Sequence, residues 1–362
     1  MPRAAATAAL GVALVLGGGL FDAEPLFVPG ASFVLLAVVS QAWVRMSARG
    51  AGVRRTLSPL RVQEDEPITL TLHATSGITP FPGGTIEEPL LSGSASPLLS
   101  GRSADIRIQA RFARRGRRRL VPPVLVIRDP LGLSEQRVSG SETVDLLVLP
   151  RTSPVDVVAD GTPRSAGHAR AMVAGSAEVE LDGLRSYRPG APASRIHWPA
   201  LARGAGLLER HLRPEGDGRP LIVLDPRAPQ RPEDLDAAVR AAASLCLALA
   251  RAGGCVIMLP GDRRAVGLDA GLGTWPALHA RLALVEATQP VPPFAAAAAR
   301  AGTVYYVAAR TGDRPARVLE RIGGPRVLVV PGDLSGRRAA FAVSGCRGYA
   351  MAPARRPKAA AA

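Results

Sequence analysis

AAATAALGVALVLGGGL (residues 4–20) and LFVPGASFVLLAVVSQAWV (residues 26–44) are the two stretches that decide how this chain folds. Neither contains a charged residue, and nearly all of their residues are apolar or small. As helices they would measure about 26 and 28 Å, close to the roughly 30 Å hydrocarbon core of a bilayer. The residues between them form a polar turn that ends at Pro25. Residues 1–50 are therefore predicted to form a transmembrane helical hairpin.

Basic residues flank this hairpin, whereas the turn between the two runs carries only acidic charges. The flanking residues are Arg3 before the first run and Arg45, Arg49, Arg54 and Arg55 after the second. The positive-inside rule then predicts a multi-pass protein of the inner (plasma) membrane with cytoplasmic soluble domains. A cleaved signal peptide is the alternative, but a cut after Ala23 would place Phe21 where a small residue is preferred. Even then, the second run would stop transfer and leave the remainder in the cytoplasm.

The composition favours aliphatic cores and a basic surface. Apolar residues make up 47% of the 362 residues but aromatic residues only 4%, and the formal net charge is +15. The chain has no Asn and one Lys, Lys358, so a coding bias that replaces Lys by Arg explains part of the charge. Attraction to anionic membrane lipids is a second reading, and nucleic-acid binding is a third. Because no aromatic-interleaved RNA-binding pattern accompanies the arginines, we expect no nucleic-acid partner.

Alternating apolar and polar residues mark strands in residues 55–150. Residues 68–72 and 106–112 alternate, and residues 121–127 and 144–149 are denser apolar runs. Gly and Pro clusters separate these runs, which predicts an all-β, sandwich-like domain. The run from Arg114 to Arg119 is expected at a hairpin tip with Gly116 at the bend, as a solvated turn or as a contact with lipid headgroups or a partner.

Residues 216–350 alternate between strand and helix signals, which predicts a doubly wound α/β sheet. The expected strands are residues 220–225, 255–259, 304–308 and 327–330, and the expected helices are residues 232–253, 274–287 and 314–322. Pro232 fits the start of the longest helix and Gly253 its end. Residues 351–362 are expected to form a disordered tail.

Arginines and aromatic residues gather in residues 151–215, which are expected to hold a linker and a spaced motif. Arg188-Pro189-Gly190-Ala191 suits a type II turn. The motif residues are Gly183, Arg185, Tyr187, Pro189, Gly190, Arg195, Ile196, Trp198, Ala202 and Arg203. This spacing resembles the signature of the bacterial domain-of-unknown-function family 58, which usually has Asp at the positions held here by Ala191 and His197.

The resemblance implies a membrane-anchored protein with a von Willebrand factor A-like (Rossmann-like) domain. It also implies association with a MoxR-type AAA+ ATPase, and hence a non-enzymatic role in interaction or assembly. The motif is then either a clasp between domains or a partner surface, and both readings stay open.

Asp225 ends the first strand of the α/β region, at the place where such sheets bind ligands. In von Willebrand factor A domains this position opens Asp-x-Ser-x-Ser, whose oxygens bind Mg²⁺. Here the row reads Asp225-Pro226-Arg227-Ala228-Pro229, so both serines are missing and an arginine is added. We therefore expect a degenerate site without metal, in which Asp225 caps a turn or pairs with an arginine.

Signatures of enzymes are mostly missing from the sequence. It has no phosphate-binding P-loop, no H-E-x-x-H and no G-x-S-x-G, and its three cysteines form no C-x-x-C pair. We expect no catalytic residues, no cofactor and no small-molecule substrate. The alternative is a cryptic hydrolase in which His197 acts with an acid such as Glu209.

Overall fold

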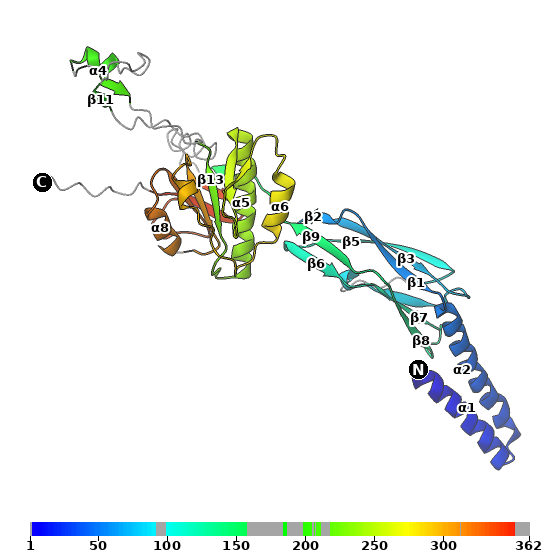
Figure 1. Ribbon diagram of the computed structural model, residues 1–362. Coiled ribbons are helices and arrows are strands. Elements are labelled where there is room, and N and C mark those ends of the chain that lie inside the picture. The colour runs from blue at the N-terminus through cyan, green and yellow to red at the C-terminus, as the bar shows by residue number, and fades with distance from the viewer. Residues whose placement is uncertain are drawn as a thin grey trace. The chain divides into compact units, whose positions relative to one another are not determined.

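The computed structural model describes residues 2–91, 99–157, 184–186, 198–204, 206, 208–210, 218–311 and 313–351. The chain divides into two compact units, Met1–Val148 and Leu149–Ala362. The first unit contains two apolar helices and three small antiparallel sheets, and the second contains an eight-stranded mixed sheet flanked by helices together with a two-stranded sheet (Figure 1). The chain is thus a mixed α/β protein that begins with a helical hairpin.

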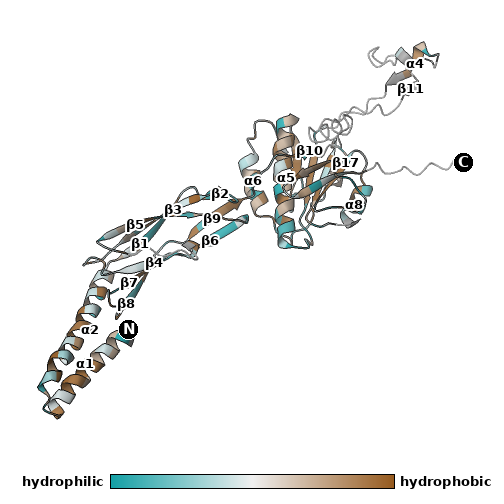
Figure 2. Cartoon of the chain, turned by 180° about the vertical axis from the view of Figure 1, so that it is seen from behind, coloured by the Kyte–Doolittle hydropathy of each residue, from teal (hydrophilic) through white to brown (hydrophobic). Residues whose placement is uncertain are grey.

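The hairpin consists of α1 (Pro2–Leu20), the short 3-10 helix η1 (Glu24–Leu26) and α2 (Phe27–Ala48). Both long helices are long and apolar enough to cross a membrane, judged by length and composition. Hydrophobic residues cover much of both helices in Figure 2, and many of them are exposed. In water this exposed apolar surface would be unfavourable, which is the physical reason to expect an apolar surrounding.

Two glycines set how closely the helices of the hairpin approach each other. A Cβ added at Gly11 would lie 2.6 Å from Gly30 O, and a Cβ added at Gly30 would lie 2.8 Å from Gly11 O. The contact is therefore reciprocal, and a side chain on either glycine would force the backbones apart. Small residues serve this purpose in helices that pack within lipid.

Three antiparallel sheets of three strands each follow the hairpin. The first sheet has the order β1 (Gly52–Leu57), β3 (Ile68–Thr75), β5 (Ser103–Ala110). The second has the order β4 (Gly84–Glu87), β7 (Val124–Arg128), β8 (Glu135–Ser139), and the third β2 (Arg61–Gln63), β9 (Val144–Leu149), β6 (Gly116–Leu120). Inward residues of the first two sheets share one core with a residue of α2, Val44. This part of the chain is therefore all-β, as the alternation predicts, and it is called the β-domain from here on.

The last turns of α2 dock on the β-domain through one face. Val44 has no exposed surface and belongs to the core that the β-strands build. Ser40 Oγ donates to Ser134 Oγ at 3.0 Å, and Ser47 Oγ donates to Pro80 O at 2.8 Å. The apolar contact and the hydrogen bonds together fix the end of the hairpin to the β-domain.

A buried ion pair ties β1 to the segment that follows β4. The side chains of Arg55 and Glu88 have no exposed surface, and Arg55 Nη2 donates to Glu88 Oε2 at 2.7 Å. The same nitrogen donates to Val121 O at 2.6 Å. Because several of its donors are bonded, the guanidinium is accommodated inside the domain instead of being left as an unpaired buried charge.

The arginine run does not form a hairpin tip, contrary to expectation. Gly116 to Leu120 form strand β6, which pairs with β9, whereas the preceding strand β5 pairs with β3 in another sheet. Arg117, Arg118 and Arg119 are exposed on β6. This strand lies at the end of the β-domain that is turned away from the hairpin (Figure 1). A contact of this run with the lipids around the hairpin therefore does not fit the fold of the first unit.

The second unit is built on one eight-stranded sheet. Its order is β10 (Asp156–Val157), β18 (Phe341–Val343), β19 (Cys346–Met351), β17 (Arg326–Pro331), β16 (Val304–Ala308), β13 (Leu221–Asp225), β14 (Cys255–Met258), β15 (Val266–Leu268). The strands β14, β13, β16 and β17 run parallel, and antiparallel strands flank them. Residues 156–157, expected in a linker, are thus part of this sheet.

Helices pack on both faces of the parallel strands. One face holds α5 (Pro232–Gly253) and α6 (Trp275–Ala283), with Leu245 and Leu278 packed on Ile222, Leu224 and Val307. The other face holds α7 (Ala295–Ala298) and α8 (Asp313–Glu320), with their cluster built around Val223 and Tyr306. The central strands are buried on both sides, which explains their continuous apolar runs.

Local signals fix the bounds of several elements. Helix α5 begins at Pro232 and ends at Gly253, as expected, because proline suits the first turn and Gly254 at φ +98° ends the helix. Strand β16 also has its expected bounds, and β13 begins one residue later than expected, at Leu221. Helix α6 is shorter than expected and ends at Ala283.

The glycine contact gives a test of the hairpin. We expect Gly11→Leu and Gly30→Leu each to lower the stability of the hairpin by about 1–3 kcal/mol through overpacking. The measurement is the amount of SDS that unfolds the chain in mixed micelles, followed by the fluorescence of Trp43 after Trp198 and Trp275 are replaced by Phe. Gly17→Leu is the matched control, because a Cβ at Gly17 meets nothing within 4 Å. Equal midpoints for all three variants would contradict the close crossing.

Candidate functional site

Asp225 lies at the carboxyl end of β13 and is held on all sides by donors. Its Oδ1 accepts from the backbone N–H of Arg227 at 3.1 Å and from Arg227 Nε at 3.0 Å. Its Oδ2 accepts from the hydroxyl of Tyr306 at 2.6 Å and from Arg227 Nη2 at 3.2 Å. Tyr306 belongs to β16, which runs parallel to β13 as its direct neighbour. The sequence predicted a turn cap or an arginine partner, and Asp225 makes both contacts.

The contacts around Asp225 shift the pKa values of both of its side-chain partners. The hydrogen bond to Asp225 raises the pKa of the Arg227 guanidinium, although partial burial opposes that shift. Burial raises the pKa of the Tyr306 hydroxyl, and the negative charge of Asp225 raises it further. The tyrosine therefore stays protonated and donates to the carboxylate. Arg227 supplies the positive charge that balances Asp225.

A metal site of conventional composition is not evident among the residues that the structure describes. No three His, Cys, Asp or Glu side chains gather there in a way that could hold a metal ion. At Asp225 the neighbouring groups are a guanidinium and a phenol, which are donors at neutral pH, whereas hard cations require oxygen acceptors. The expectation that no metal binds here stays a prediction.

The three cysteines are buried in the second unit and are free thiols. Burial raises the pKa of the Cys346 thiol to about 12 and also raises that of Cys246. Since the thiolate is the nucleophilic form, these residues are poorly suited to covalent chemistry. They pack as small apolar side chains in the core on the α5 face, where Cys255 is the third member.

His279 has a structural environment. Its ring stacks on Trp275 with centroids 4.5 Å apart, and its Nε2 lies 2.7 Å from Pro150 O. Burial lowers the pKa of this histidine, so the neutral ring with a proton on Nε2 fits the contact. The histidine thereby anchors the segment that enters the second unit.

Only part of the predicted motif falls within the described residues. Arg185 lies on β11 (Leu184–Ser186), which pairs with β12 (Leu208–Arg210) so that Arg185 is opposite Glu209. Trp198 begins α4 (Trp198–Ala202) and is 57% exposed, and Arg203 after this helix is also exposed. The motif residues Tyr187, Pro189, Gly190 and Arg195 lie outside the described residues, as does His197. The hydrolase alternative therefore stays untested, because His197 lies outside the described residues.

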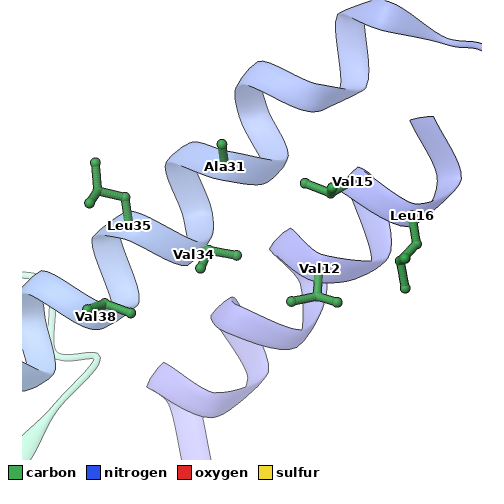
Figure 3. Close-up of a pocket in the computed structure, with 7 residues that line it drawn as sticks. All are labelled: Val12, Val15, Leu16, Ala31, Val34, Leu35 and Val38. Atoms are coloured by element: carbon green, nitrogen blue, oxygen red, sulfur yellow. The ribbon is translucent and has the colours of Figure 1, made fainter. Parts of the chain in front are cut away.

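An apolar groove lies between the two helices of the hairpin. Its volume is about 430 Å³. Val12, Val15 and Leu16 of α1 and Ala31, Val34, Leu35 and Val38 of α2 line it (Figure 3). The lining offers no polar anchor that would orient a specific small molecule.

Comparisons with known proteins leave the family open. No family model matches the chain, and no curated protein matches it. One similar solved structure is the Pseudomonas fluorescens alkylpurine DNA glycosylase AlkC bound to DNA containing an abasic site analog, at 16% identity and a TM-score of 0.13. The similarity covers 33% of this chain and 39% of the glycosylase chain. At that TM-score it carries no argument about fold or function.

The network around Asp225 yields a stability prediction. Asp225→Ala leaves the buried Tyr306 hydroxyl without its acceptor, so we expect a loss of about 1–3 kcal/mol in the free energy of unfolding. In urea unfolding, Tyr306→Phe in the same background should then cost less than it does alone, since the two groups are coupled. Asp269→Ala is the control, because this aspartate of the same unit is exposed at the surface and its removal should change the stability little. Mg²⁺ should not shift the wild-type midpoint, and a saturable rise in stability with Mg²⁺ would show that Arg227 does not take the place of a metal.

Proposed function

We propose that the chain is a membrane-anchored, non-enzymatic bacterial interaction or assembly protein whose two soluble domains lie in the cytoplasm. The observation that carries the proposal is the polarity of the hairpin. The basic residues Arg3, Arg45 and Arg49 stand at one end of the helices, and Asp22 and Glu24 stand at the other. A positive-inside arrangement places the basic end at the cytoplasmic face.

The packing of the first unit supports the same arrangement. The N–H of Ala4 at the start of α1 donates to Leu133 O at 3.1 Å, and the end of α2 packs on the same β-domain. Both basic ends of the hairpin thus meet the β-domain, and the acidic turn lies away from it (Figure 1). A hairpin that spans the membrane in this orientation keeps the β-domain on the inner side.

We further propose that the α/β unit is von Willebrand factor A-like. Its four parallel strands with helices on both faces support this assignment, together with the aspartate at the carboxyl end of β13. The Arg227 contact to Asp225 favours a domain that recognises its partner without a bridging metal ion. Protein–protein recognition then falls to exposed side chains.

A MoxR-type AAA+ ATPase is the partner that the sequence resemblance suggests. The exposure of Trp198 and Arg203 supports a partner surface over an internal clasp, because a clasp would bury them. Exposed Trp and Arg side chains are frequent anchors of protein interfaces. We propose that these residues and Arg185 contribute to the surface that binds the ATPase.

The membrane orientation can be tested with reporters fused after Ala362. A fluorescent protein that folds only in the cytoplasm should be active there, and alkaline phosphatase at the same place should be inactive. The reverse outcome would contradict the cytoplasmic assignment. Fusions after Ala23, in the turn between the helices, provide the internal control and should give the opposite pattern, because this turn is expected on the outer side.

The partner can be tested by reconstitution with a purified MoxR-type ATPase from the same genome. Charge reversal of Arg185 and Arg203 to Glu should reduce recovery of the ATPase with the detergent-solubilised chain by about tenfold or more. Arg263→Glu with Arg264→Glu is the matched control, since these exposed residues of the second unit carry the same charge change. Equal recovery with both variants would remove the proposed surface, and no recovery with the wild type would remove the partner.

A further inference from the structure

Two loops of the β-domain surround the end of the hairpin where the arginines lie. The first is the turn between β7 and β8, residues 129–134, and the second is the segment of residues 76–81 that runs along the last turns of α2. Together with the exposed arginines at this end they are called the seat. We propose that the seat enters the headgroup layer of an anionic bilayer leaflet, so that Leu131 and Ile78 reach the edge of the hydrocarbon. The inference rests on the proposed membrane anchor and adds a lipid-binding surface to it.

The part of the hairpin that is free of the β-domain is too short to span the hydrocarbon core unless the seat enters the headgroup layer. Residues 27–39 of α2 lie before Ser40, which makes the first hydrogen bond from α2 to the β7–β8 turn among the described residues, and they measure about 20 Å, well short of a hydrocarbon core of roughly 30 Å. From Ser40 onward α2 is tied to that turn through Ser134. In α1, Ala4 is already bonded to Leu133 of the same turn. Unless the bilayer thins considerably, its inner boundary must therefore include the β7–β8 turn.

The β7–β8 turn has hydrogen bonds and an exposed apolar tip that suit a position in the headgroup layer. The Asp129 carboxylate accepts from the backbone N–H of Leu131 at 3.0 Å and from that of Ser134. Asp129 O accepts from the N–H of Gly132 at 3.0 Å, so the backbone N–H groups of Leu131, Gly132 and Ser134 are bonded within the turn. Asp129 is buried, whereas Leu131 at the tip is 62% exposed. An apolar tip whose N–H groups are bonded enters a headgroup layer at a lower cost than one whose N–H groups lose water without a partner.

The second loop presents the same combination of features. The N–H groups of Gly77 and Ile78 donate to Ser47 O and Met46 O of α2, at 2.7 and 3.1 Å. Ile78 is nevertheless 55% exposed. Beside it the indole N–H of Trp43 donates to Pro80 O at 3.3 Å, and 40% of this side chain is exposed. Tryptophan with one bonded polar atom and an exposed apolar ring is typical of the interface between membrane and water.

The charge of the seat selects the lipid. Arg3, Arg45 and Arg49 are exposed at this end of the hairpin, and none of them has an ion-pair partner within the part of the chain that the structure describes. Arg3 lies beside Gly132 of the β7–β8 turn. A basic residue at an anionic surface contributes about 1 kcal/mol. Exposed apolar side chains beside guanidinium groups that lack an ion-pair partner in the described residues fit a layer of anionic headgroups better than a layer of uncharged headgroups.

The depth of the seat can be measured on the full chain in nanodiscs of phosphatidylglycerol and phosphatidylcholine. Single cysteines are introduced as Leu131→Cys and Ile78→Cys and labelled with bimane, the native thiols being buried. Brominated acyl chains should quench both labels at least about twofold more than a label at Leu60→Cys. Leu60 is 52% exposed and precedes β2, at the end of the β-domain away from the hairpin, which makes it the matched control (Figure 1).

A label at Leu35→Cys, on the free part of α2, separates the two proposals. Quenching at position 35 without quenching at positions 131 and 78 overturns the seat and leaves the anchor intact. The lack of quenching at all four positions overturns the anchor and the seat together. Quenching at positions 35, 131 and 78 but not at position 60 supports both.

The lipid preference is tested in the same system. Replacing phosphatidylglycerol by phosphatidylcholine should reduce the quenching at position 131, because the arginines lose their anionic partners. Arg45→Gln with Arg49→Gln should abolish this difference between lipids. Arg117→Gln with Arg118→Gln on β6 removes the same charge at the other end of the β-domain and should keep it. Quenching that is independent of lipid charge would overturn the anionic preference.

Discussion

The first unit depends on the docking of α2 on the β-domain. Val44 lies in a helix whose composition suits a membrane, yet it has no exposed surface and completes a core of β-strand residues. Burying such a side chain contributes about 1.5–3 kcal/mol, and the hydrogen bonds of Ser40 and Ser47 give the contact a direction. Because one rigid helix belongs both to the hairpin and to this core, the orientation of the hairpin fixes the orientation of the β-domain. The proposed orientation and the proposed seat both follow from this coupling.

Elements specified by local chemistry were predictable from the sequence. The hairpin helices followed from two uncharged runs, and α5 followed from Pro232 at its start and glycines at its end. Strand β6 was misjudged because its partner β9 lies far along the chain. A run of arginines around Gly116 has the local pattern of a turn, and only pairing with Leu146 and its neighbours makes it a strand. Such pairing is a property of the tertiary structure and leaves no local signal.

The candidate site shows the same division. The departure from Asp-x-Ser-x-Ser was enough to predict an arginine partner for Asp225, because Arg227 is two residues away. Tyr306, 81 residues further on, was missed. The sequence did hold a signal for this contact, namely a tyrosine within an apolar run that was expected to be a buried strand. In the parallel register of β13 and β16, Asp225 pairs with Ala308, so Tyr306 lies close to Asp225. A polar side chain within such a buried strand needs a partner, and Asp225 was the available acceptor.

Several arginines of this chain form contacts inside the folded domains, so the net charge of the chain does not all represent a surface for binding. Arg55 bridges Glu88 and a backbone carbonyl inside the β-domain, and Arg227 balances Asp225. Arg326 is buried and donates to Leu319 O and Ile322 O at the end of α8, where helix carbonyls lack partners. A guanidinium serves these sites because its five donors spread over a plane. Part of the charge of +15 therefore stabilises the fold, and the net charge is a weaker argument for nucleic-acid binding than its size suggests. The exposed arginines beside the hairpin are the ones for which we propose a binding role, with anionic lipid headgroups.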